Sequence, residues 1–94
     1  EPYAREAFRR RRQVTMFGRP VWVHSPEDTI LSKLRWYKMS PVLDRQLQDA
    51  LEVYEIQEPD LDQDYLDRWA DQLSVADLLA RIRAEASRPP QEER

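Results

Sequence analysis

The stretch from His24 to Lys38 constrains the fold most, because it opens with an unusually complete helix start. Ser25 can cap the helix with its side chain, and Pro26 suits the first helical position. The two acids that follow complement the positive end of the helix dipole. Apolar residues then recur at helical spacing, at Ile30, Leu31, Leu34 and Tyr37. The sequence therefore predicts an amphipathic helix that begins at Ser25 and stops at Ser40-Pro41.

Three further segments carry an apolar stripe at helical spacing, within residues 43–54, 61–73 and 75–86. Glu58-Pro59-Asp60 breaks the chain between the first and second of them. Ser74 stands where a side-chain cap of the last helix is expected. Trp69 lies on the second of these stripes and is expected to be buried. Residues 25–86 are thus predicted to form a four-helix module.

The N-terminal part has a different pattern. Residues 2–8 can form a short helix, with a proline in its first turn. Residues 13–17 and 21–23 are rich in β-branched and aromatic residues, and Gly18-Arg19-Pro20 separates them, which predicts a β-hairpin over about 12–24. We therefore expect an α+β fold that is mostly α. It forms one small domain over 1–86, followed by a disordered tail over 87–94.

Charge is divided unevenly along the chain. Residues 1–23 carry a net charge of +4, and residues 24–94 a net charge of −7. Arg9, Arg10, Arg11 and Arg12 form the densest basic run, and nearby aromatic residues could stack on bases, namely Phe8, Phe17 and Trp22. Such a run can contact phosphates or RNA. In a strand, however, alternate arginines point to opposite faces, and the acidic remainder of the chain repels a polyanion.

No catalytic residue and no metal site are predicted. The only histidine, His24, has no serine or cysteine nucleophile arranged beside it. Asp60, Asp62 and Asp64 alternate as in a calcium loop, but Tyr65 stands where that loop needs glycine. A helix start rich in acids explains them instead. The absence of cysteine fits a reducing cytoplasm, and no apolar run is long enough to span a membrane.

Two motifs together resemble a known family. Ser25-Pro-Glu-Asp-x-Ile-Leu-x-Lys-Leu34 is followed by a helix with Arg45 and Asp49, and then by Leu61-Asp-x-x-Tyr-Leu-x-x-Trp-Ala-x-x-Leu73. From about residue 9 to 86 the sequence resembles the C-terminal part of nucleotidyltransferase-like proteins. These belong to the superfamily that includes the AbiEii-type toxins of toxin–antitoxin systems.

The resemblance implies that Lys33 approaches a nucleoside triphosphate and that Asp49 belongs to the same nucleotide site. It also implies Mg²⁺ and a nucleoside triphosphate for the full protein, with tRNA as a target in the toxins. The family's catalytic Gly-Ser and Asp-x-Asp signature has no counterpart here. Judged by helical spacing alone, Lys33, Asp28 and Asp49 are typical of solvent-exposed helix charge.

Two functions follow as alternatives. The chain starts at Glu1 and its first methionine is Met16, so we expect a piece of a longer protein or an incomplete gene product. In the first reading it is a helical module that supports nucleotide binding, is inactive alone and packs on a catalytic domain. In the second reading it is a non-enzymatic interaction module or antitoxin-like partner, which docks another protein through its hairpin edge and surplus aromatic residues.

Overall fold

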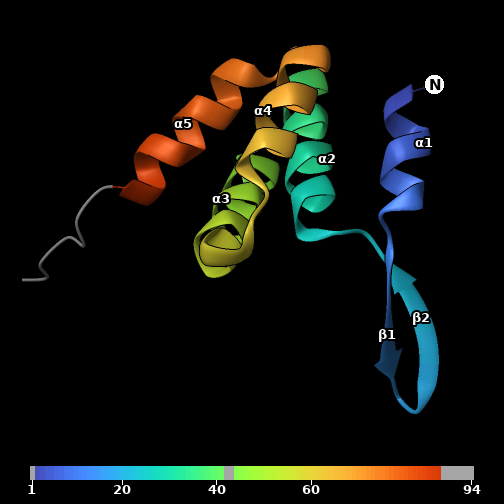
Figure 1. Ribbon diagram of the computed structural model, residues 1–94. Coiled ribbons are helices and arrows are strands. Elements are labelled where there is room, and N and C mark those ends of the chain that lie inside the picture. Colours follow the sequence, from blue (N-terminus) through green and yellow to red (C-terminus); the bar gives the residue numbers. More distant parts are fainter. Residues whose placement is uncertain (1, 42–43, 88–94) are drawn as a thin grey trace, which may run out of the picture.

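The computed structural model describes residues 2–41 and 44–87, which form a helical body and a protruding β-hairpin (Figure 1). Helix α1 (Pro2–Arg9) precedes strands β1 (Arg12–Met16) and β2 (Arg19–Val23). The body follows as α2 (Pro26–Met39), α3 (Arg45–Gln57), the one-turn 3₁₀ helix η1 (Glu58–Asp60), α4 (Gln63–Gln72) and α5 (Ala76–Ser87). The mostly helical α+β class is confirmed, with one α-helix before the hairpin and four after it in the described part.

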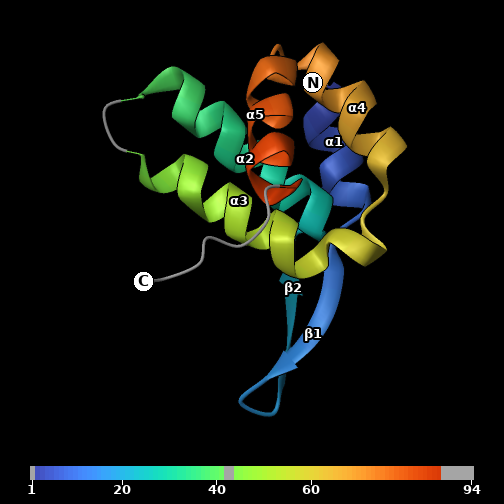
Figure 2. The same cartoon turned by 90° about the vertical axis from the view of Figure 1, so that its left-hand side faces the viewer.

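The core lies among the helices. Helix α2 packs most extensively against α3, α5 lies on α3, and α4 contacts both α2 and α5 (Figure 2). Helix α1 adds Tyr3 and Ala7 to the same core. Its other buried apolar residues are Ile30, Leu31, Leu34, Leu47, Ala50, Tyr54, Leu61, Tyr65, Leu66, Ala70, Val75, Leu79 and Ile82. These are the stripe positions, so burial of apolar surface explains why the body forms.

The start of α2 matches its sequence signals. The Ser25 side chain accepts a hydrogen bond from the Asp28 amide at 3.1 Å, and Pro26 occupies the first helical turn. The helix ends at Ser40, whose amide bonds the Trp36 carbonyl. Leu43, the first residue of the next predicted stripe, lies outside the described residues.

The role predicted for Ser74 is wrong. Ser74 does not cap α5; it ends α4 in a left-handed conformation, with φ of 63°. The Val75 amide bonds the Ala70 carbonyl and the Ser74 amide bonds the Asp71 carbonyl. This pair of hydrogen bonds is the Schellman pattern that closes a helix C-terminus. A serine stands where glycine is usual, which is why the sequence pattern suggested a cap.

The hairpin is present, but its turn begins one residue earlier and ends two residues earlier than the predicted Gly18-Arg19-Pro20. Met16 pairs with Arg19, so Phe17 and Gly18 alone form the turn, with φ of 54° and 74°. Two successive positive φ values give the tight turn that matches strand twist. Arg19 and Pro20 therefore belong to β2. A proline fits there because this two-stranded sheet consists only of edge strands.

The ends of the predicted domain are described in part. Ser87, placed in the tail by its sequence, is the last residue of α5. Residues 88–94 of that predicted tail lie outside the described residues. Within the described part, no helix is both long and apolar enough to cross a membrane.

Candidate functional site

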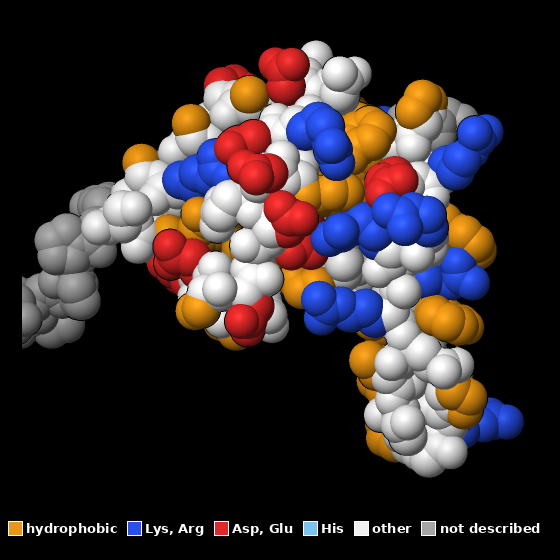
Figure 3. Space-filling view, viewed as in Figure 1, with side chains coloured by type: hydrophobic (Ala, Val, Ile, Leu, Met, Phe, Trp, Pro, Cys, Tyr) orange, Lys and Arg blue, Asp and Glu red, His pale blue; other side chains and the backbone are white. Residues whose placement is uncertain are grey.

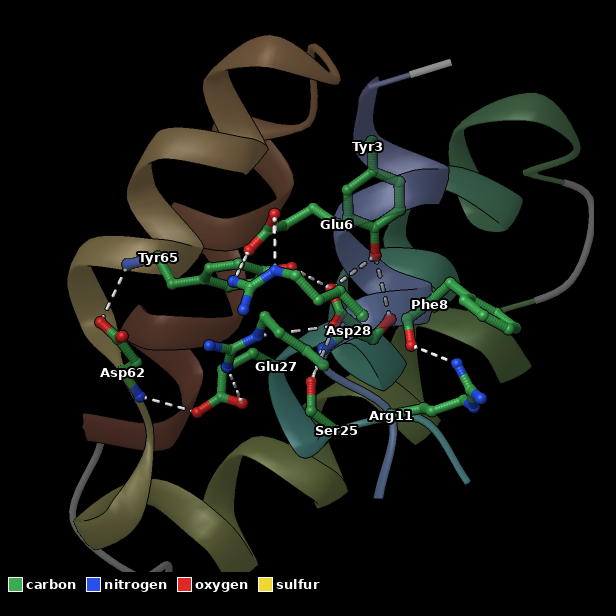
Figure 4. Close-up of polar contacts among 11 residues, drawn as sticks. Tyr3, Glu6, Phe8, Arg11, Ser25, Glu27, Asp28, Asp62 and Tyr65 are labelled. Carbon is green, nitrogen blue, oxygen red and sulfur yellow. Dashed lines mark hydrogen bonds and ion pairs between the residues drawn. The ribbon is translucent and has the colours of Figure 1, made fainter. Parts of the chain in front are cut away.

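The first candidate is a cluster of buried polar residues where α2 begins. Ser25, Glu27 and Asp28 are each at most 2% exposed. Figure 4 shows them facing side chains from α1 and α4. The expectation that Asp28 lies on the surface is therefore wrong, because α1 and α4 cover the first turn of α2.

The Asp28 carboxylate is the centre of this cluster. Its Oδ1 accepts hydrogen bonds from the Tyr3 hydroxyl at 3.0 Å and from the Tyr65 hydroxyl at 2.6 Å. Its Oδ2 accepts one from the Ser25 hydroxyl at 2.8 Å. Asp28 thus joins α1, the α2 cap and α4 through one side chain.

Both tyrosines are held in their protonated form. Burial raises the pKa of Tyr3 above its ordinary value, and the neighbouring Asp28 carboxylate raises it further. Burial and the hydrogen bond to Asp28 likewise raise the pKa of Tyr65. A phenol that stays protonated stays a donor, so the pair remains bonded to Asp28 well above neutral pH.

Glu27 is paired as completely as Asp28. Its Oε1 accepts from Arg10 at 2.9 Å, and its Oε2 accepts from the Asp62 amide at 2.8 Å. The Arg10 guanidinium also lies 3.8 Å from Asp28 Oδ2 and 3.9 Å from the centre of the Tyr65 ring. Because every charge here has a partner, the cluster serves as a structural junction and holds no free acid, base or nucleophile.

The arginine run is divided by the structure. Arg10 belongs to this buried junction, and Arg9 pairs with Glu6 on the surface of α1. Arg11 lies 3.6 Å from the Phe8 ring centre and 4.4 Å from that of Trp22. Arg12 is an exposed strand residue. The four predicted phosphate contacts therefore do not form one continuous basic patch.

The second candidate surrounds Lys33, the first residue implied by the resemblance. Its Nζ lies 3.4 Å from Oδ2 of Asp49, the second such residue, across the α2–α3 contact. Both side chains are about one-third exposed. A pair this long and this open to water contributes little to stability and can be exchanged for another anion.

A cavity of about 200 Å³ lies beside Lys33 on α2. His24, Thr29, Ser32 and Trp36 complete its lining, and the Trp36 side chain is 57% exposed. One ammonium group, one imidazole and two hydroxyl groups can donate hydrogen bonds to phosphate oxygens. An exposed indole can stack on a flat ring. The cavity therefore offers a few hydrogen-bond donors and an aromatic face within a lining that is mostly apolar.

Thr29, Ser32 and Trp36 are not among the site residues predicted from the sequence. Their positions one turn apart on α2 place them with Lys33 on one helical face, and that spacing was a usable signal. The alternating acids have a structural place, since Asp62 caps α4 by accepting from the Tyr65 amide at 3.0 Å. In the part of the chain described, no three histidine, cysteine or acidic side chains lie together as a metal site would require.

Comparison with known proteins assigns this chain to no family. No protein-family model, no curated protein and no solved structure matches this chain. The site must therefore be interpreted from its own geometry and from the sequence resemblance.

Proposed function

We propose that this chain is a non-catalytic helical module that supplies a phosphate contact, Lys33, to a nucleotidyltransferase-like protein. The observation that carries the proposal is the meeting of Lys33 and Asp49 at the edge of a partly open cavity on α2. Helices α2 and α3 carry these residues, and their packing is the most extensive in the body. The contact is therefore held on a rigid support.

The division of roles follows from the chemistry of the lining. Lys33 would bind the phosphates as a mobile point charge, and Asp49 would hold the ammonium in place until the nucleotide arrives. Thr29 and Ser32 would donate hydroxyl hydrogen bonds, and Trp36 would stack on the base.

The Mg²⁺ ion implied by the resemblance fits this set poorly. Among the described residues, Asp49 is the one carboxylate that contacts Lys33 and the cavity lining holds none, whereas Mg²⁺ is usually bound through carboxylates together with substrate phosphates. We therefore assign the ion and the catalytic carboxylates to another part of the full protein, and assign no step of transfer chemistry to these residues.

A titration with ATP and inorganic tripolyphosphate, followed by NMR, tests the proposal. We expect both ligands to shift the amides of Ser32 and Lys33, and ATP alone to shift the Trp36 indole. Lys33→Ala should weaken binding by about 10- to 100-fold, the scale of a charge-assisted hydrogen bond. The melting temperature of the Lys33→Ala variant without ligand should differ little from that of the unchanged protein.

Arg81→Ala is the matched control, because it removes an exposed cation beside a different cavity, between α3 and α5. It should leave both titrations unchanged. Binding that Lys33→Ala does not affect, or that depends equally on Arg81, would refute the proposal.

A second function, docking of another protein, is favoured by one observation. The hairpin leaves the body with its apolar side chains uncovered, including Met16 at 47% and Trp22 at 54% exposure.

A further inference from the structure

The hairpin makes almost no packing contact with the helical body. The only extensive contact of β1 and β2 is with each other, and Figures 1 and 2 show the pair extending away from the helices. No residue of either strand is buried. Two strands alone are marginally stable in water, so this element gains most from a third strand.

The strand register shows which edge can accept a third strand. Pro20 has no N–H group, so Thr15 and Pro20 must form a pair without mutual hydrogen bonds. Because such pairs alternate along the ladder, Gln13 and Trp22 form the next one. Gln13 and Thr15 therefore direct their N–H and C=O groups outward from β1. On β2, Pro20 removes one of the two corresponding donors, so β1 is the better open edge.

The two faces of the hairpin differ in chemistry. One face carries Val14 and Met16 of β1 beside Val21 and Val23 of β2, with Arg12 and Arg19 at its ends. The other face carries Gln13 and Thr15, together with the stack of Arg11 on the Trp22 ring. A strand added along β1 would thus meet apolar side chains on one face and polar or basic ones on the other.

The positive charge of the hairpin indicates which kind of partner strand would bind it. Residues 7–26 contain five arginines and no acid. Two of these arginines are paired with Glu6 and Glu27, whereas Arg11, Arg12 and Arg19 have no carboxylate partner within the described residues. Figure 3 shows several basic side chains where the hairpin joins the body, a further one near the far end of the hairpin, and apolar side chains along it. A partner strand with acidic residues would neutralise these cations.

We propose that the β1 edge binds an extended strand of a partner protein that is apolar on one face and acidic near its ends. A second copy of the chain is disfavoured, because pairing two β1 edges would bring six unpaired arginines together. A nucleic acid is disfavoured because Arg11 and Arg12 lie on opposite faces and form no continuous phosphate track. This proposal is independent of nucleotide binding at Lys33.

A capped seven-residue peptide is the probe. It has threonine at its even positions, valine at positions three and five, and aspartate at both ends, so that the valines and aspartates share one face. We expect it to shift the amides of Gln13 and Thr15 by NMR, with no shift at the Trp36 indole. The same peptide with lysine at its ends, or with its β1-facing amides N-methylated, should bind at least tenfold more weakly.

Variants of the protein separate edge pairing from simple charge attraction. Thr15→Pro removes an outward N–H without breaking the ladder, and Pro20 already occupies the paired position. It should weaken peptide binding at least tenfold, whereas Thr15→Val, which keeps the N–H, should not. Arg12→Glu should weaken binding of the aspartate peptide and improve binding of the lysine peptide.

Three results would overturn the proposal. The first is no binding of the aspartate peptide up to its solubility limit, or equal binding of the N-methylated one. The second is a concentration-dependent dimer in sedimentation that Thr15→Pro abolishes, which would make a second copy the occupant. The third is binding of oligouridine that shifts the same hairpin amides and displaces the peptide, which would make the surface a nucleic-acid site.

Discussion

Charged residues are buried and paired in the helical body but exposed in the hairpin. In the body, Asp28 is fully buried and accepts hydrogen bonds from Tyr3, Tyr65 and Ser25. In the hairpin, Arg12 and Arg19 lie exposed beside uncovered apolar side chains. The difference indicates that the polar groups of the buried junction maintain the fold, while the exposed charges of the hairpin contribute little to it.

Arg10 stands between the two regions. It follows α1 directly and lies two residues before β1, yet its side chain reaches Glu27 in the body. The hairpin is therefore attached through a partly buried ion pair at its base, and the strands beyond it make little contact with the body. This arrangement gives a rigid body that carries an open strand edge.

Removal of the central carboxylate should give the largest effect. Asp28→Asn leaves two buried phenols and a nearby guanidinium without their anion, so we expect a loss of about 3–5 kcal/mol in the free energy of unfolding. Chemical denaturation measures it. Asp49→Asn, which breaks the partly exposed pair with Lys33, should cost at most about 1 kcal/mol. Equal costs would mean that Asp28 does not hold the junction.

A pair of tryptophan variants compares the two regions directly. Trp69 packs against the core, with its ring 5.5 Å from that of Tyr3 and 6.5 Å from that of Tyr65. Trp69→Ala should therefore lower the free energy of unfolding by about 3 kcal/mol, the lower end for a buried aromatic residue. Trp22→Ala in the hairpin should cost at most about 1 kcal/mol, the scale of its contact with Arg11. A denaturation midpoint unchanged by Trp69→Ala would place that residue outside the core.

The tyrosines of the junction predict a loss of stability in alkali. Their pKa values are raised in the folded protein, whereas an unfolded tyrosine titrates near pH 10. Above pH 10 the unfolded chain releases protons that the folded chain retains, so stability falls as pH rises. The slope approaches about 1.4 kcal/mol per pH unit for each tyrosine. Denaturation midpoints from pH 8 to 11 test this, and Tyr65→Phe should reduce the slope. An unchanged slope in that variant would mean that Tyr65 does not contribute to the loss of stability in alkali.

The sequence predicted the elements of the body because local rules dominate there. The Ser25 cap and the apolar stripe of α2 act within one or two helical turns, so spacing alone identified them. The burial of Asp28, in contrast, depends on Tyr3 and Tyr65, which lie far from it in sequence. No local pattern distinguishes a carboxylate that two remote phenols will cover from one that faces water.

Errors of local prediction occurred at residues in the left-handed conformation. Phe17 and Ser74 both have positive φ, which is uncommon for residues other than glycine. The sequence pattern therefore predicts a turn at Gly18-Arg19-Pro20, which begins one position after the first positive φ of the hairpin, and a cap at Ser74 for the start of α5, whereas Ser74 ends α4. At the candidate site, Lys33 and Asp49 came from the family resemblance, while the cavity beside them needed the packed structure.

Residue-by-residue amide hydrogen exchange tests the contrast between body and hairpin most directly. Val14 and Val21 form a hydrogen-bonded pair in the hairpin, and the amides of Leu31 and Leu34 lie in the fully buried part of α2. We predict that the hairpin amides exchange through local opening, at a free energy well below that of global unfolding, while those of α2 exchange only when the whole body unfolds. Equal protection in the two regions would contradict the account, because the hairpin would then be part of the cooperative core.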